Sequence, residues 1–111
     1  MKQKPYVINI GLNVGNFEPA TQLAETLRIA GITAFKLNSS EYDGVPERTV
    51  VACINLFPEI METYIQSICM LLEQDCIAIR PVEEPAEGQL IWSPYHRGEV
   101  FPFNPDYFIE L

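Results

Sequence analysis

The spacing of the apolar residues switches between two periods along this chain, and that switching constrains the fold more than any other feature. In residues 6–12 every second residue is strongly apolar, which is the pattern of a strand with one apolar face. In residues 20–30 the apolar residues recur at helical spacing, and Gly31 follows as a C-terminal stop. The chain therefore begins with a strand and a helix.

The same switching continues to residue 92. Further strands are expected at residues 32–38, 48–56, 76–80 and 89–92, the last two as a hairpin. A second helix begins at Phe57-Pro58-Glu59 and ends near Gln74 or Asp75, because apolar residues again recur at helical spacing. Polar segments at 39–47 and 81–88 are predicted to form a turn and an acidic loop.

This order predicts an α+β protein with the ferredoxin-like fold, the split β-α-β arrangement (order βαββαβ) whose sheet carries two helices on one face. An extra C-terminal strand and an aromatic, proline-rich tail follow. Right-handed crossovers place the first and third strands at the centre of the sheet. The resemblance is to a superfold, covers residues 5–80 and implies no function. A doubly wound parallel sheet is the alternative, disfavoured because residues 38–48 have no helical period.

The length predicts a single domain over residues 1–111, with its core at about 5–92 and an irregular C-terminal tail at 93–111. Six of the twelve aromatic residues lie in the last twenty positions, with prolines between them. No helical or strand period fits this segment. It is expected either to wrap over the domain or to form a docking surface.

The formal net charge of −8 is concentrated in the second half of the chain. Residues 1–55 hold five basic and five acidic residues, whereas residues 56–111 hold two basic and ten acidic ones. Such a surface repels a phosphate backbone and favours a basic protein partner. We therefore expect no direct nucleic-acid binding. The alternative is a solvated acidic surface that only keeps the protein soluble.

Several features predict a cytoplasmic protein that does not bind a membrane. No apolar run approaches the roughly 18 residues that a membrane span needs, and the start of the chain does not match a secretory signal. Cys53, Cys69 and Cys76 show no paired spacing for a metal or a redox couple. Their apolar surroundings predict reduced thiols buried in the core.

Asparagines interrupt the strand positions that turn away from the helices. If the apolar residues point to the helices, Asn9, Asn13 and Asn55 lie on the opposite face of the sheet. Buried amides need partners, because each brings two donors and an acceptor. The tail is expected to supply those partners from its backbone. Alternatively, a small-ligand groove lies between sheet and tail, or a second copy pairs through this open face as a homodimer.

The sequence contains no specific catalytic, cofactor or metal motif. The segment at residues 11–15 matches neither glycine pattern of the phosphate-binding loops. His96 and Arg97 could supply a base and a cation, but a lone histidine in a segment punctuated by proline and glycine is more often structural. One histidine and three cysteines do not assemble a ligand set. We therefore predict no catalytic residue, no cofactor and no metal ion.

These observations predict a small acidic inhibitor or adaptor, of the kind that phages and other mobile elements make, which binds a basic partner protein. Aromatic side chains form interface hot spots, and carboxylates steer basic partners. The predicted contact residues are Trp92, Tyr95, His96, Arg97, Phe101, Phe103, Tyr107, Glu83, Glu84 and Glu87. The alternative is a small-molecule-binding or weakly catalytic domain that uses Asn9, Asn13, Asn55 and the segment Tyr95-His96-Arg97.

Overall fold

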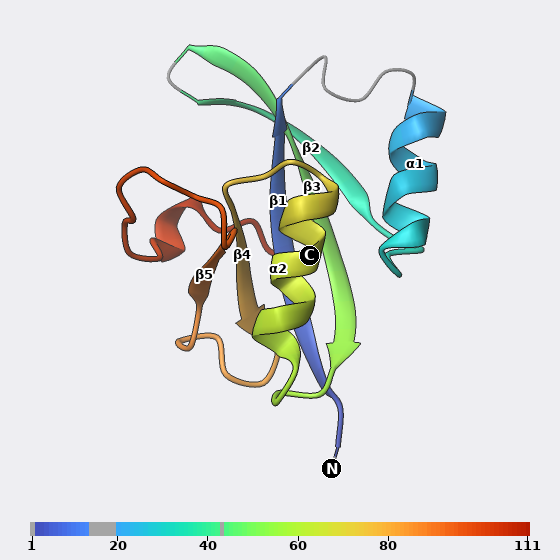
Figure 1. Ribbon diagram of the computed structural model, residues 1–111, viewed down its shortest axis with the longest axis vertical. Coiled ribbons are helices and arrows are strands. Elements are labelled where there is room, and N and C mark those ends of the chain that lie inside the picture. The colour runs from blue at the N-terminus through green and yellow to red at the C-terminus, as the bar shows by residue number, and fades with distance from the viewer. Residues whose placement is uncertain (1, 14–19, 43) are drawn as a thin grey trace.

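The protein is an α+β domain with a five-stranded antiparallel sheet and two helices (Figure 1). The computed structural model describes residues 2–13, 20–42 and 44–111. The elements are β1 (Lys4–Asn13), α1 (Ala20–Ile29), β2 (Lys36–Tyr42), β3 (Val45–Leu56), α2 (Met61–Leu71), β4 (Cys76–Pro81), β5 (Gln89–Trp92) and the short 3-10 helix η1 (Pro105–Tyr107).

The strand order is β2-β3-β1-β4-β5, and every neighbouring pair is antiparallel. Among the first four strands, β3 and β1 therefore occupy the two middle places. The register places Ile8 of β1 opposite Ala52 of β3 and Ile79 of β4. The parallel sheet considered as an alternative is thereby excluded.

One face of this sheet forms the core with both helices. Residues directly opposite each other in antiparallel strands share a face, and so do residues two apart along a strand. Ile8, Ile10 and Ile79 are fully buried on this face, together with Leu27 of α1 and Ile65 of α2. We call it the helix face. The alternation that predicted β1 is thus confirmed, because its apolar positions point to the helices.

The end of α1 explains why the second strand starts later than predicted. Gly31 has φ of +85°, and its N–H donates to Arg28 O at 3.0 Å while Ile32 N–H donates to Leu27 O at 2.8 Å. These two bonds are the pair that closes a helix at a left-handed glycine, with the next apolar residue packed against the helix. Ile32 is buried as part of this motif, and β2 begins only at Lys36.

The predicted polar turn at residues 39–47 is wrong for most of its length. Strand β2 continues to Tyr42 and pairs with Val45, the first residue of β3. Gly44, with φ of +78°, lies in the short connection that remains. Asp43 lies outside the described residues. Asp-Gly between two strands is a hairpin signal in its own right, and it outweighs the polarity of the flanking residues.

The three cysteines differ in their surroundings. Cys69 is buried and its thiol lies 3.7 Å from Ile91 O, whereas Cys76 is half-buried. Cys53 is exposed. The prediction of buried thiols is therefore confirmed for Cys69 and wrong for Cys53, because Cys53 falls on the face of β3 that does not meet the helices.

Candidate interaction surface

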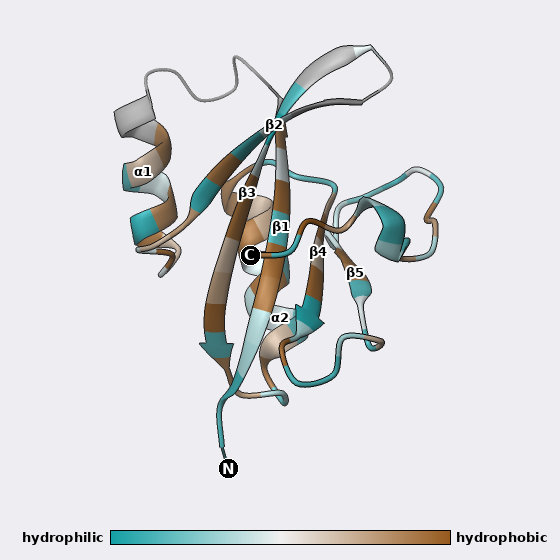
Figure 2. Ribbon diagram, turned by 180° about the vertical axis from the view of Figure 1, so that it is seen from behind, coloured by the Kyte–Doolittle hydropathy of each residue, from teal (hydrophilic) through white to brown (hydrophobic). Residues whose placement is uncertain are grey.

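The second face of the sheet is partly covered by the end of the chain. Val7 and Asn9 of β1 alternate with the core residues, and their cross-strand neighbours include Val51 and Arg80. Figure 2 shows the C-terminal segment crossing this face, on the side away from α2. We call it the tail face. Val7 and Val51 are buried there although they do not belong to the core cluster.

Asn9 is bound to this segment through both ends of its amide. Its Nδ2 donates to Ile109 O at 2.9 Å, and its Oδ1 accepts from Ile109 N at 2.7 Å. The side chain therefore pairs with the tail backbone as a neighbouring strand would. Because a buried amide without partners costs about 1–3 kcal/mol, this reciprocal pair explains how a central strand tolerates Asn9. The prediction that tail backbone satisfies the amide is confirmed at this residue.

Arg80 holds the same segment through an ion pair and a contact with an aromatic ring. Its guanidinium forms a forked ion pair with Glu110, with Nε at 2.8 and 3.0 Å from the two carboxylate oxygens. It also donates to Pro81 O at 2.8 Å and lies 5.8 Å from the centre of the Phe108 ring. The hydrogen bond to Glu110 raises the pKa of Arg80. We call residues 108–110 the C-terminal anchor.

The predicted aromatic residues form two clusters rather than one. The Trp92 ring centre lies 4.5 Å from that of His96 and 5.0 Å from that of Phe101, which meets it edge-on. The Phe103 and Phe108 ring centres are 5.6 Å apart, next to the anchor. All three distances lie in the range of attractive aromatic contacts. The tail is thus ordered by its own side chains as well as by the sheet.

Three of the predicted aromatic side chains remain largely in solvent. Tyr95, Phe101 and Tyr107 are 72%, 57% and 82% exposed. Trp92 and Phe103 are half-buried, and Arg97 is exposed. Tyr95 and Tyr107 therefore face outward, whereas Phe101 is exposed and also packs against Trp92.

The acidic loop lies against this tail. A Cβ atom added to Gly88 would come within 2.3 Å of the Phe103 ring, so only glycine permits this contact. Glu84 pairs with Lys4 at 2.8 Å, and this hydrogen bond lowers the pKa of the Glu84 carboxyl. A hydrogen bond to Glu84 raises the pKa of Glu87. Glu83 is exposed. The acidic loop therefore contacts the tail at Gly88 and Phe103.

Among the described side chains of the predicted small-molecule site, Asn9 and Asn55 do not lie together. Asn9 is used by Ile109, and Asn55 is exposed at a register position four residues away from it along the strands, or about 13 Å at strand spacing. The side chain of Asn13 lies outside the described residues. His96 does not approach Asn9 or Asn55: its Nε2 lies 3.0 Å from Glu99 O and its Nδ1 lies 3.7 Å from Asp75.

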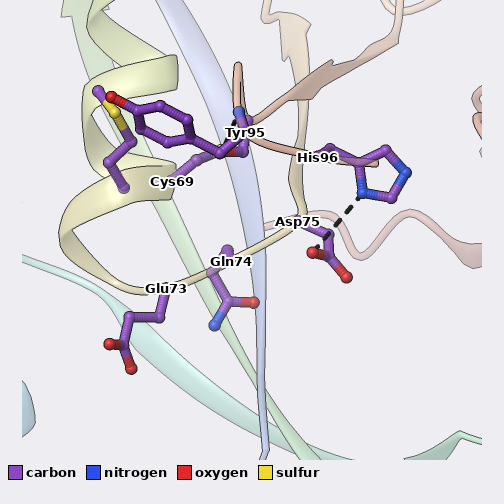
Figure 3. A pocket seen from close by; sticks show the side chains of 8 residues that line it. Cys69, Glu73, Gln74, Asp75, Tyr95 and His96 are labelled. Carbon is purple, nitrogen blue, oxygen red and sulfur yellow. Dashed lines mark hydrogen bonds and ion pairs between the residues drawn. The ribbon is translucent and has the colours of Figure 1, made fainter. Parts of the chain in front are cut away.

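A shallow depression of about 300 Å³ lies where the tail meets the end of α2 (Figure 3). It forms because Ser93 N–H donates to Asp75 O at 2.8 Å, which brings the start of the tail to the turn after α2. The residues that line it are Cys69, Met70, Glu73, Gln74, Asp75, Ser93, Tyr95 and His96. We call it the helix-end pocket. A second depression of similar size, lined by Asn55 and Tyr64 among others, lies beside β3.

Sequence reasoning missed the residues that fix the tail. Arg80, Gly88 and Glu110 contact partners far away along the chain, and nothing local in the sequence marks them. Asn9 was the exception, because an amide on an otherwise apolar strand required a partner. Glu73 and Asp75 were also missed as surface residues of the helix-end pocket, since their role depends on where the tail begins.

The chain matches no known protein family model, no curated protein and no solved structure. Among the described residues, none of the helices is long and apolar enough to cross a membrane. Within the same residues, no three histidine, cysteine or acidic side chains lie close enough to hold a metal ion. The geometry of the surface is therefore the main guide to function.

Proposed function

We propose that this protein is a small acidic inhibitor or adaptor that binds a basic partner protein through its tail and acidic loop. The observation that carries the proposal is the exposure of Tyr95, Phe101 and Tyr107 on a tail that is otherwise anchored. An anchored aromatic residue loses little further freedom when it binds, so less of the interaction energy is spent on ordering it.

Charge supports the choice of partner. Glu83, Glu99 and Asp106 are exposed around the tail, and the chain as a whole carries −8. Carboxylates around an aromatic centre steer a basic surface into contact and repel phosphate and anionic lipid headgroups. The proposed partner is therefore a protein with a basic surface, and neither a nucleic acid nor a membrane.

We also propose that the fold is ferredoxin-like and that the protein lies in the cytoplasm. The order β2-β3-β1-β4, with a helix between β1 and β2 and another between β3 and β4, supports the ferredoxin-like arrangement with β5 added at one edge. The free thiols at Cys53, Cys69 and Cys76 support a reducing compartment, the cytoplasm.

The two alternatives, a small-molecule site and a homodimer, have less support. A small-molecule site would need Asn9, whose amide is already bound to Ile109. A homodimer through the tail face stays a prediction, but the C-terminal anchor leaves a second copy only the part of that face near β2 and β3. We therefore retain the partner-binding function as the principal proposal.

Affinity capture from cells that express the protein tests this function. The double variant Phe101→Ala/Tyr107→Ala removes two exposed aromatic side chains, and Ile29→Ala on α1 is the matched control, since Ile29 is 67% exposed far from the tail in sequence. We expect the double variant to bind the captured partner about tenfold or more weakly, as loss of hot-spot side chains does. Ile29→Ala should bind normally.

Salt and charge reversal complete the test. Capture by the natural protein should fall as the salt concentration rises, because screening shortens the reach of surface charges. At low salt, the variant Glu83→Lys/Glu87→Lys should capture less partner than the natural protein does. Equal recovery of the same partner by the natural protein and Phe101→Ala/Tyr107→Ala would disprove the tail as the contact surface.

A further inference from the structure

The helix-end pocket combines an apolar wall with an acidic rim. Tyr95 and Met70 are 72% and 43% exposed, and both line the depression. Figure 3 shows the Tyr95 ring lying toward the helix beside Cys69, with Glu73 and Asp75 on the turn that follows. Of its eight lining residues, two are carboxylates and none is lysine or arginine.

The electrostatics of this pocket favour a cation. It lies at the C-terminal end of α2, whose last turn holds no basic residue. A helix C-terminus carries a partial negative charge, which lysine or arginine commonly offsets. Here Glu73 and Asp75 add negative charge to that end instead, and His96 is the only lining residue that can carry a positive charge.

We propose that the helix-end pocket receives an arginine side chain of the basic partner. A guanidinium can stack on the exposed Tyr95 ring and pair with Asp75 or Glu73 at the same time, because it is planar and presents several donors. An ammonium group offers only a point charge. This inference rests on the proposed function and adds the chemistry of one contact to it.

The probe is N-acetyl-arginine amide, added to isotope-labelled protein and followed by NMR. The backbone signals of Glu73, Gln74, Asp75 and Tyr95 should move together along one saturable curve. N-acetyl-citrulline amide, which has the same shape without the charge, should leave them unmoved at equal concentration. N-acetyl-lysine amide should bind more weakly than the arginine amide.

Two variants and one control locate the binding. Asp75→Asn should weaken binding about two- to fivefold, the range of exposed charge pairs, and Tyr95→Ala should do so by a similar factor through the lost ring contact. Tyr107→Ala is the matched control, because Tyr107 is an exposed tail tyrosine that does not line the pocket. It should bind the probe normally.

The outcomes separate this inference from the proposed function. Unchanged binding in both Asp75→Asn and Tyr95→Ala, or an equal response of the Glu83–Glu87 signals, would overturn the pocket. The pocket would also be overturned if Asp75→Asn and Tyr95→Ala captured the partner normally while Phe101→Ala/Tyr107→Ala did not capture it. The proposed function would then stand. If no captured partner depends on the tail, the proposed function fails whatever the pocket binds.

Discussion

The two faces of the sheet are closed in different ways. The helix face is apolar and packs against α1 and α2, with Ile8 and Ile79 fully buried. The tail face holds Asn9 and Arg80 and is partly covered by the C-terminal anchor through hydrogen bonds and an ion pair. Apolar contact depends on shape alone, whereas each polar contact needs one particular partner group. The helix face therefore stabilises the fold, and the tail face fixes where the tail lies.

The largest difference between the faces is expected in thiol reactivity. Burial raises the pKa of the Cys69 thiol to about 12, against an ordinary 9.0, so far less of it is reactive thiolate at neutral pH than of an ordinary thiol. Cys53 on the tail face is exposed. Mass spectrometry after brief alkylation should find Cys53 modified and Cys69 untouched. Equal modification of both in the folded protein would contradict the packing of the helix face.

A core truncation should have the largest effect on stability. Ile8→Ala leaves a cavity on the helix face and should lower the free energy of unfolding by about 2–5 kcal/mol. Urea denaturation followed by circular dichroism measures this change. Asn9 is the neighbouring residue on the other face. If Ile8→Ala lowered the free energy of unfolding by less than Asn9→Ala, the helix face would not be the one that stabilises the fold.

On the tail face, Asn9→Ala should lower the free energy of unfolding by less than Ile8→Ala does. Its effect should be more local. It removes both hydrogen bonds to Ile109, and we expect a loss of about 1–3 kcal/mol in the free energy of unfolding. Asn55→Ala is the matched control, because Asn55 is exposed and should change stability by less than about 0.5 kcal/mol. The same urea titration compares the two. Equal effects would mean that the pairing with Ile109 contributes nothing.

The smallest effect is expected at the rim of the sheet, from the pair Lys4–Glu84. Pairing holds the pKa of Glu84 below its ordinary 4.5. The pair's contribution to the stability of the folded protein is therefore present above pH 4.5 and is lost as the pH falls through the lower folded pKa. The raised pKa of Glu87 acts in the opposite sense and offsets part of it. In a plot of the free energy of unfolding against pH, Lys4→Met should make the decline at acid pH slightly less steep. A steeper decline in the variant would contradict this pairing.

The sequence predicted the elements better than the contacts between distant segments. The period switch located both helices and all five strands, because each element needs one apolar face whatever its neighbours are. It misplaced the start of β2, where Ile32 serves the end of α1, and it made the turn around Gly44 too long. The amide of Asn9 predicted tail contact correctly.

The rest of the surface could not be predicted from local patterns. Arg80 and Glu110 meet across thirty positions of sequence, and Asn9 meets Ile109 across one hundred. Which aromatic residues anchor the tail and which stay exposed depends on those meetings. The helix-end pocket likewise exists only because Ser93 binds the backbone of Asp75.

Hydrogen exchange at the backbone amide of Ile109 tests most directly whether the tail closes the sheet. In the folded protein its N–H donates to Asn9 Oδ1, so it should exchange well below the rate of a free peptide, and Asn9→Ala should remove that protection. Exchange of Ile109 at the free-peptide rate in the natural protein would show that the tail is not anchored. The exposed aromatic surface would then have no fixed position to offer a partner.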